Sequence, residues 1–337
     1  MSSGRIVAVL GSTGLQGTSV VKSLLRDGTF KPRAVARNPE SAAARELADL
    51  GAAVVKGDLL DKASLLNAFM GCVAVFGITV PMYYDGADDT GIDEVVQGKN
   101  LVDAAKDAGV KFLVFSSLPS LAKLTDGKFT KAKNAEDKAT VEDYLRANGL
   151  PHAAIHPGFF IENLWRYQFL RKSPTGLTFS VPLTPPDTMV LLTWVERDIP
   201  AVVLALLKNY DSADADKRSL VLGGVFPVVT TCSTYGAVAD DISNAIDAPV
   251  AYVPGPGGAP PGDDSWLGKV YLSKHDWVPE PVPYPALVKL GVHLSTMQDL
   301  IRQEIKPRGS TCTKGHANVK DVTTCAQPGC GASCTNN

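Results

Sequence analysis

Residues 5–27 read RIVAVLGSTGLQGTSVVKSLLRD, and this stretch decides the fold. The apolar run 6–10 is typical of a buried β-strand, and apolar residues recur at helical spacing over 15–26. A glycine loop joins the two segments. A strand, a glycine-rich turn and a helix in this order predict the first β-α unit of a parallel sheet.

The glycines of this loop are spaced as G-x-x-G-x-x-G. Glycine is needed where a backbone turns tightly, approaches a pyrophosphate or packs a helix against a strand, and the helix N-terminus then faces the phosphates. The loop is therefore either a dinucleotide site or simply a strand-to-helix turn, and its place between strand and helix favours the dinucleotide site. Cofactor contacts are expected from Gly11, Thr13, Gly14, Leu15, Gln16 and Gly17.

Outward from this unit, the first half of the chain alternates β-branched runs with helix-like segments. The expected strands are 5–10, 33–36, 54–55, 73–79, 112–115 and 153–155. The expected helices are 15–26, 40–50, 64–70, 92–108 and 128–148 and, after a turn at 156–158, 199–207, 234–246 and 286–305. Right-handed crossovers would arrange the strands as a Rossmann-type, doubly wound parallel sheet of the α/β class.

The alternation loosens after residue 157, where proline becomes frequent. We expect a dinucleotide-binding Rossmann domain over 1–157 and a smaller C-terminal substrate lobe mainly over 158–306, with some elements returning to the sheet. Residues 307–337 have almost no large apolar side chains, so core burial could not offset the entropy cost of ordering them. They are interpreted as a flexible, cysteine-containing tail.

Composition limits the partners of the chain. Its 337 residues are 45% hydrophobic and 20% charged, which fits a globular protein and excludes disorder as the main state. The 33 basic and 35 acidic side chains nearly cancel, so we expect no nucleic-acid partner. We expect no membrane partner, because no apolar stretch approaches the roughly 20 residues that span a bilayer. The short apolar run at the N-terminus is unlike a secretory leader, which favours a reducing, cytoplasmic compartment.

The residue that ends the second strand normally selects the cofactor, because a carboxylate there binds the ribose 2′-hydroxyl of NAD. This chain has Arg37 at that place, and a guanidinium can bind the 2′-phosphate of NADP with two hydrogen bonds. We therefore interpret Arg37 as an NADP-selecting residue, with Arg33 as a weaker candidate. The alternative is a solvated surface arginine.

Further NADPH or NADP contacts are expected at the ends of the next two strands. Asp58 and Leu59 follow the third strand, beside the expected adenine, although Asp58 or Asp61 could instead cap the next helix. The nicotinamide end is expected beside the residues that follow the fourth strand, which are Thr79, Val80 and Pro81.

Seven blocks occur in order within residues 5–305: VAVLGSTGLQGTSVVKSLL, AVARNP, VVKGDLLD, VAVFGITVP, FLVFSSL, KATVEDYLRANGLPHAAIHPGFFIENL and WVERDIP. Together they resemble the NmrA-like family of atypical short-chain dehydrogenase/reductases, which also includes isoflavone-reductase-like enzymes. The resemblance implies an NADP-binding Rossmann domain and a small C-terminal substrate lobe. It implies one of two functions, since some members reduce small molecules and others are inactive redox sensors that bind transcription factors.

Short-chain reductases usually carry a tyrosine four residues before a lysine on one helix face, where the ammonium lowers the phenol pKa. The resemblance places the lysine at Lys138, and Asn134 stands where the tyrosine would be. None of the nine tyrosines has a lysine four residues later. Isoflavone-reductase-like enzymes use the lysine directly or through water, so the resemblance implies that Lys138 holds the nicotinamide ribose and acts as general acid. From the residues alone, Lys138 could equally be a solvated surface lysine.

Ser116 ends the fifth strand and is a second catalytic candidate, because its hydroxyl could bind a substrate carbonyl or could merely cap a turn. His156 is expected to be buried, neutral and hydrogen-bonded. Aromatic residues after the sixth strand could line a substrate cleft, or could equally well pack in a core. Substrate contacts are expected from Phe159, Phe160, Asn163 and Tyr83, the last a spare phenol that could replace the missing acid.

The tail contains residues of the types that bind zinc, namely Cys312, His316, Cys325, Cys330 and Cys334. Their gaps are irregular and lack the paired C-x-x-C knuckles of structural zinc sites, so we expect no metal.

Two functions remain open from the sequence. The leading hypothesis is an NADPH-dependent reductase of a C=O, C=C or C=N bond in a small, partly aromatic substrate, working as a monomer or homodimer. The alternative is a catalytically silent sensor of NADP(H) that binds a regulatory protein such as a transcription factor. Asn134 in place of tyrosine favours this alternative.

Overall fold

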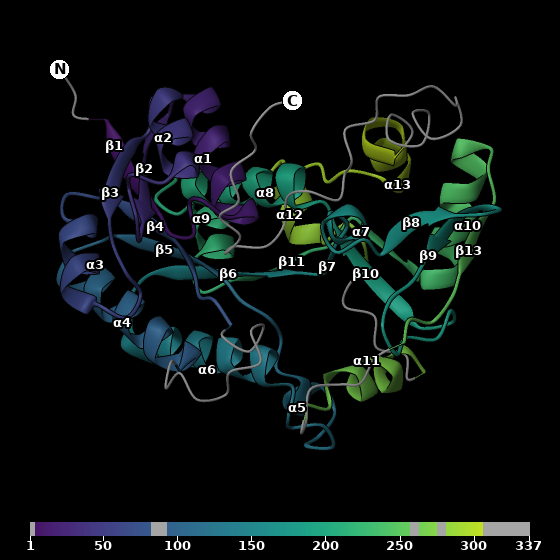
Figure 1. Ribbon diagram of the computed structural model, residues 1–337. Coiled ribbons are helices and arrows are strands. Elements are labelled where there is room, and N and C mark those ends of the chain that lie inside the picture. The colour runs from purple at the N-terminus through teal and green to yellow at the C-terminus, as the bar shows by residue number, and fades with distance from the viewer. Residues whose placement is uncertain (1–3, 82–92, 257–262, 275–280, 306–337) are drawn as a thin grey trace.

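A parallel sheet organises the first part of the molecule (Figure 1). The computed structural model describes residues 4–81, 93–256, 263–274 and 281–305. Its main sheet has the strand order β11-β6-β5-β4-β1-β2-β3, and all neighbouring strands are parallel. The chain order reverses between β1 (Arg5–Val9) and β4 (Ala74–Ile78), which makes their carboxyl ends the topological switch point where such sheets bind ligands. The predicted Rossmann-type sheet is therefore confirmed.

The remaining strands of this sheet are β2 (Phe30–Ala36), β3 (Ala53–Lys56), β5 (Phe112–Ser116), β6 (His152–Pro157) and β11 (Val225–Val228).

Helices cover both faces of the sheet (Figure 1). One face packs against α1 (Leu15–Asp27), α2 (Ala42–Asp49), α8 (Val195–Asn209), α9 (Ala215–Val221) and α12 (Pro285–Lys289). The other face packs against α3 (Lys62–Phe69), α4 (Glu94–Asp107) and α6 (Lys133–Asn148). Val7 and Val9 of β1 point into the first core, whereas Ala8 points into the second. A strand buried on both faces must be apolar throughout, which explains the unbroken apolar run in the sequence.

A smaller lobe lies beyond the carboxyl end of the main sheet (Figure 1). One of its sheets has the order β12-β10-β7, formed by β7 (Phe159–Phe160), β10 (Met189–Thr193) and β12 (Thr231–Thr234). The second has the order β13-β9-β8, formed by β8 (Leu170–Ser173), β9 (Gly176–Phe179) and β13 (Val250–Tyr252). The core of the lobe also takes side chains from α7 (Asn163–Arg166), α10 (Tyr235–Ile246), α13 (Met297–Leu300) and the π-helix η2 (Ile301–Ile305).

A separate contact joins the lobe to the segment before α6. Leu121 of α5 (Leu121–Leu124) and Leu272 of α11 (Ser265–Ser273) belong to one small apolar cluster. Asp264 accepts hydrogen bonds from the backbone N–H groups of Thr130 at 3.2 Å and Lys131 at 3.0 Å. The lobe thereby fixes the chain just before the helix that carries Lys138.

Four sequence predictions are corrected by the structure. The helix predicted over 128–148 begins at Lys133, because Asp264 binds the preceding backbone in a non-helical form. The helix predicted over 286–305 is broken after α12, where Gly291 has a φ of 77°. The turn predicted at 156–158 is wrong, since β6 continues through Pro157. Strand β11 was not predicted, and it pairs with β6 from far along the chain.

The predicted tail, 307–337, and its cysteines lie outside the described residues. Within the described ranges, every helix is too short or too polar to cross a membrane.

Candidate functional site

The glycine loop has the geometry that its spacing predicted. Gly11 adopts a φ of 59°, a left-handed conformation that favours glycine, and its carbonyl accepts a hydrogen bond from Gly14 N at 2.9 Å. A Cβ on Gly17 would lie 2.2 Å from Gly11 O, which is well inside contact distance. The loop is tied to the second strand, because Ser12 Oγ donates to Val35 O at 2.8 Å. Glycine at 17 therefore allows α1 to pack directly against the loop.

The first turn of α1 fits an anion. Gly14 is the N-cap residue and makes no side-chain capping bond, and the first turn of this helix carries no acidic residue. The first backbone N–H groups of a helix have no intrahelical acceptor and carry a partial positive charge. The start of α1 therefore offers backbone donors at the switch point, as a pyrophosphate requires.

The ends of β2 and β3 lie beside this loop. Arg37 follows β2 and is exposed, so its guanidinium is accessible. Asp58 follows β3 and is half-buried, and its Oδ1 accepts a hydrogen bond from Leu60 N at 2.9 Å. Asp61, not Asp58, caps α3. Arg33 is used elsewhere, because its Nη1 donates to Ala68 O at 2.9 Å.

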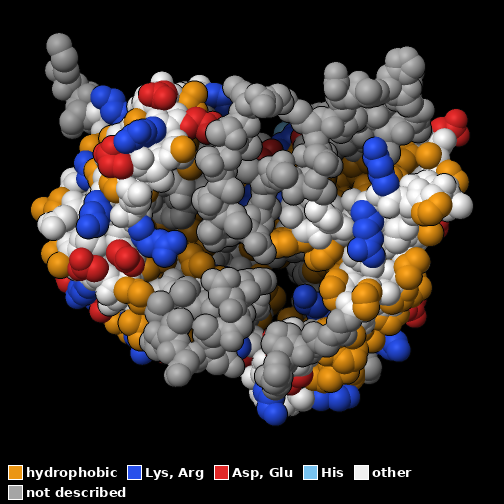
Figure 2. All heavy atoms as spheres, in the orientation of Figure 1, with side chains coloured by type: hydrophobic (Ala, Val, Ile, Leu, Met, Phe, Trp, Pro, Cys, Tyr) orange, Lys and Arg blue, Asp and Glu red, His pale blue; other side chains and the backbone are white. Residues whose placement is uncertain are grey.

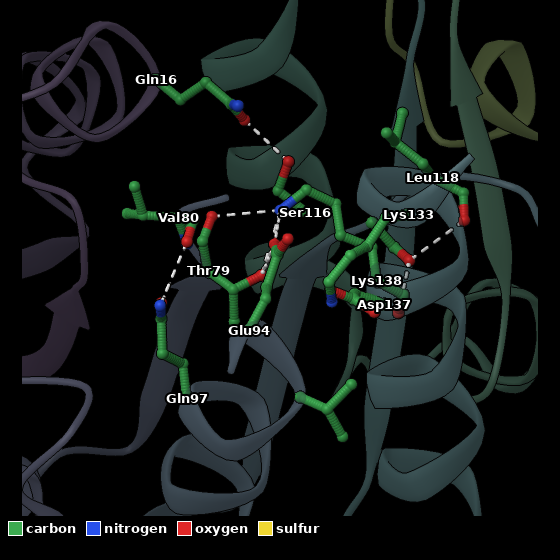
Figure 3. Close-up of polar contacts among 12 residues, drawn as sticks. Gln16, Thr79, Val80, Glu94, Gln97, Ser116, Leu118, Lys133, Asp137 and Lys138 are labelled. Carbon is green, nitrogen blue, oxygen red and sulfur yellow. Dashed lines mark hydrogen bonds and ion pairs between the residues drawn. The ribbon is translucent and has the colours of Figure 1, made fainter. Parts of the chain in front are cut away.

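The other end of the site brings together segments that are far apart in sequence (Figure 3). Lys138 Nζ of α6 donates to Glu94 Oε1 of α4 at 2.5 Å. It also donates to Thr79 O and Thr79 Oγ1, each at 3.0 Å. The Thr79 hydroxyl in turn donates to Glu94 Oε1 at 2.6 Å. An ammonium has three N–H donors, so this arrangement engages all of them.

Lys138 is buried, with 9% of its surface exposed, and is not a solvated surface lysine. Burial lowers the pKa of Lys138 because an ammonium is poorly solvated in the interior, and the carboxylate of Glu94 acts in the opposite direction. Buried charges of this kind cluster at functional sites.

Sequence reasoning missed Glu94 and Gln97, which lie on the first turn of α4. Gln97 Nε2 donates to Val80 O at 3.1 Å, and Val80 N donates to Gln97 Oε1 at 3.0 Å, so one amide fixes the backbone after β4. Helical spacing alone places both residues on the face that carries Leu101 and Ala105. Glu94 and Gln97 are polar residues at the helical spacing of a buried apolar face, and this pattern is the sequence feature that could have identified them.

Ser116 does not contact Lys138 through a hydrogen bond. Its Oγ donates to Gln16 Oε1 at 2.7 Å, and both residues are buried. The neighbouring Ser117 Oγ donates to the Lys138 carbonyl at 3.3 Å. Ser116 and Ser117 together thus link Gln16, in the first turn of α1, to α6, and Figure 3 shows the bond between Ser116 and Gln16.

Two further acids of this region are buried. Glu142 lies one turn after Lys138 and pairs with His156 Nε2 at 2.8 Å, and the hydrogen bond from His156 keeps the pKa of Glu142 low despite burial. Glu162 follows β7 and is 1% exposed. Its Oε1 accepts a hydrogen bond from Glu196 N at 3.0 Å, and its Oε2 has no hydrogen-bond partner within the part of the chain that the structure describes. Burial raises the pKa of Glu162 to about 7. His156 is hydrogen-bonded, as expected, but only half-buried.

The residues predicted to contact substrate lie in different parts of the structure. Phe159 packs in the lobe core, edge-on to Tyr235 with ring centroids 5.8 Å apart, whereas Phe160 packs against the core of the main sheet. Asn163 begins α7 and is half-buried. Tyr83 lies outside the described residues. Figure 2 shows this face of the molecule hollowed between the main sheet domain and the lobe.

Among the described residues, no group of three or more His, Cys, Asp or Glu side chains is placed to hold a metal ion. The metal-ligand types of 312–334 lie outside those residues.

A family model and the sequences of known relatives both assign this chain to the same family. The model described as the NmrA-like family matches residues 3–259. The "NmrA-like family domain-containing oxidoreductase cpsB" of Aspergillus campestris is 34% identical over 265 residues, which are 74% of this chain and 75% of that protein. Several further relatives align over about half of their length.

Solved structures share the fold. The crystal structure of Nmra, a negative transcriptional regulator, has a TM-score of 0.70 at 21% identity and covers 92% of this chain and 98% of its own. The triphenylmethane reductase of Citrobacter sp., solved in complex with NADP(H), has a TM-score of 0.66 at 19% identity and covers 89% of this chain and 99% of its own. At these identities the likeness establishes a common fold, shared by a regulator and a reductase.

Proposed function

The chain belongs to the NmrA-like family, and we propose that it is an NADPH-dependent reductase of a C=O, C=C or C=N bond in a small, partly aromatic substrate. The observation that carries this proposal is Lys138, a buried ammonium held by Glu94 and Thr79 at the carboxyl edge of the sheet. Relatives named as oxidoreductases and a reductase of the same fold support it.

The residues of the glycine loop fit the cofactor. The uncapped start of α1 would hold its pyrophosphate, and the exposed Arg37 would bind the 2′-phosphate of NADPH. Asp58 and Leu59 would lie beside the adenine, and Thr79, Val80 and Pro81 beside the nicotinamide. When bound, the dihydronicotinamide supplies a hydride.

Lys138 would supply the proton that completes the reduction. One N–H group of Nζ would leave its acceptor on Thr79 and give its proton to the substrate heteroatom, or to the carbanion formed from a C=C bond, directly or through one water molecule. Lys138 would thereby become a neutral amine. The amine then regains a proton from solvent. Gln16, Ser116 and Gln97 fix the backbone and side chains around this position.

The test combines binding with turnover. Purified protein is titrated calorimetrically with NADPH, NADP, NADH and NAD, and NADPH absorbance is then followed with a panel of enones, quinones, imines and aldehydes. We expect preferential NADPH binding and consumption with at least one compound. Lys138→Met should lower kcat by roughly 10² to 10⁴, the usual contribution of a general acid.

Lys123→Met is the matched control, because Lys123 is exposed and pairs with Asp143 on the surface. Turnover that survives Lys138→Met unchanged would refute the proton-donor assignment. Absence of NADPH binding would refute the cofactor site formed by Gly11 to Gly17 and Arg37.

A second candidate function is a silent NADP(H) sensor that binds a regulatory protein. Asn134 favours it, because this residue lies one turn before Lys138 on α6 and leaves the site without the phenol of standard reductases. The similarity of fold to a negative transcriptional regulator is consistent with it. Tight NADPH binding without consumption across the panel would select this function, and partner affinity should then change with cofactor occupancy, as linkage requires.

A further inference from the structure

Glu94 is a deeply buried carboxylate in direct contact with Lys138, the proposed proton donor. Its side chain is 1% exposed, and the side chain of Lys138 is 11% exposed. Glu94 begins α4 directly after the capping residue Asp93, so its place depends on where this helix starts. The carboxylate reaches back to the end of β4, where Oε1 accepts from both Lys138 and Thr79.

Burial of this ion pair costs desolvation free energy that an apolar contact in the same place would not cost. A buried ion pair recovers the desolvation of its charges only when geometry and hydrogen bonding are good, and an apolar pair of the same size is often as stable. Glu94 Oε2 is moreover buried and has no hydrogen-bond partner among the described residues. Most buried polar atoms in proteins are paired with protein groups or with ordered water, so Oε2 has the capacity to accept a hydrogen bond from water or from a bound molecule.

We propose that Glu94 is a positioning residue that holds Lys138 as an oriented ammonium in the proton-donating state. The proposal rests on the proposed function, in which Lys138 gives the proton. The Glu94 carboxylate attracts the charged form of Lys138, and Thr79 fixes the direction of Nζ through its carbonyl and its hydroxyl. Once Lys138 has lost its proton to the substrate, the adjacent carboxylate favours the return of a proton from water to Nζ. Only a proton moves in these steps, and neither Glu94 nor Lys138 is oxidised or reduced.

Other charges near Lys138 leave this role to Glu94. Asp137 is next to it on α6 and is paired with Lys133; it acts on the pKa of Lys138 in the same direction as Glu94, but more weakly. The groups that β4, β5 and α1 contribute to the described site are Thr79, Ser116 and Gln16, and none of them ionises in the physiological range. Among the described residues, Glu94 is thus the carboxylate in contact with Nζ.

The direct test measures the protonation of Lys138 without substrate or cofactor. The full-length protein is labelled with acetic anhydride over a range of pH, and the peptide containing Lys138 is quantified by mass spectrometry, since only the neutral amine reacts. In Glu94→Gln we expect the pH of half-maximal labelling to fall by about 1 to 3, the usual effect of losing an opposite charge in contact. Equal labelling profiles for the wild type and Glu94→Gln would overturn the proposal.

Asp143→Asn is the matched control. It removes a carboxylate from the same helix, but one that is 57% exposed and paired with Lys123. Its Lys138 labelling profile should match the wild type; the same shift in both variants would show a general charge effect and would refute the specific role of Glu94. Should Glu94→Gln fail to fold, Thr79→Val removes the hydroxyl bound to both partners. We then expect faster Lys138 labelling at a given pH, and an unchanged rate would count against the proposal.

A kinetic readout separates positioning from a purely structural role. In Glu94→Gln, the basic limb of the kcat–pH profile should move to lower pH with little change in KM for NADPH, and Glu94→Asp should restore part of the shift. A profile that keeps its shape and merely falls in height would contradict the positioning role. The labelling result does not depend on turnover, so failure of the reductase assignment and failure of the role of Glu94 are distinguishable.

Discussion

The two halves of the carboxyl edge of the sheet are built in different ways. The half formed by β1, β2 and β3 presents backbone N–H groups at the start of α1, and its buried polar side chains are the neutral ones of Ser12, Gln16 and Ser19. The half formed by β4, β5 and β6, together with the lobe strand β7 that follows β6 in the chain, buries ionisable groups, among them Lys138, Glu94 and Glu162. A phosphate can be bound by peptide N–H groups, whereas a proton can be given only by a group that titrates. After the roles proposed above, the half at β1, β2 and β3 is called the phosphate half, and the half that contains Lys138 is called the proton half.

This difference predicts how each half responds to change. The phosphate half should be sensitive to the volume of a side chain at the glycines and nearly insensitive to pH. The proton half should be sensitive to the loss of one charge and to pH, because each of its buried ions depends on a partner or on a favourable pKa.

The largest effect is expected from Glu94→Ala, which leaves the ammonium of Lys138 without its carboxylate. Removal of one partner of a buried pair costs about 3 to 5 kcal/mol, and neutralisation of Lys138 would bring the value toward the lower end. Urea unfolding measures it. Asp143→Ala, at an exposed pair, should cost less than about 1 kcal/mol. Equal losses in both variants would remove the distinction between the two kinds of ion pair.

The next effect concerns pH and Glu162, whose pKa is raised by burial from the ordinary 4.5 to about 7. Between these values the folded state keeps a proton that the unfolded state has released. Glu162 therefore makes the fold less stable as pH rises through this window, by about 3 kcal/mol in total. The free energy of unfolding of Glu162→Gln, measured at pH 5 and pH 8, should lack this decline. The same decline in wild type and variant would exclude Glu162 as its origin.

A smaller effect is expected from Gly17→Ala in the phosphate half. The new Cβ would lie 2.2 Å from Gly11 O, so the helix must move away from the loop. Overpacking of this kind costs about 1 to 3 kcal/mol, and NADPH affinity should fall by roughly 10- to 100-fold in calorimetry. Gly28→Ala is the control at the other end of α1: no atom lies within 4 Å of the added Cβ, but the φ of 76° strains alanine, so this variant loses stability without touching the glycine loop. That variant should bind NADPH normally.

The smallest effect is expected from Arg37→Ala. Loss of a charged hydrogen bond to the 2′-phosphate costs about 1.5 kcal/mol at an exposed site, so NADPH affinity should fall roughly tenfold. NADH affinity should stay the same, because NADH has no 2′-phosphate. A parallel loss of both affinities would show that Arg37 supports the loop and does not select the cofactor.

The sequence by itself determined the glycine loop and six of the seven strands of the main sheet. The glycine loop is contiguous, and its requirements are local: a left-handed φ at Gly11 and no Cβ at Gly17. Alternation of apolar runs with helical segments was enough to place six strands of the sheet, because burial on both faces leaves a clear apolar signal. Strand β11 was missed because it is short and pairs with β6 across about 70 residues of chain.

Only the tertiary structure decided the proton half. Sequence and family resemblance pointed to Lys138, but whether it is solvated or buried depends on what packs over α6, and the answer is α4 and the end of β4. Glu94 has an ordinary helix-start position in the sequence. Ser116 was predicted as a catalytic candidate or a turn cap, and its hydrogen bond to Gln16 could not be predicted from the sequence. Partners that are 44 to 100 residues apart cannot be read from local patterns, because the state of a buried charge is set by the groups that surround it in space.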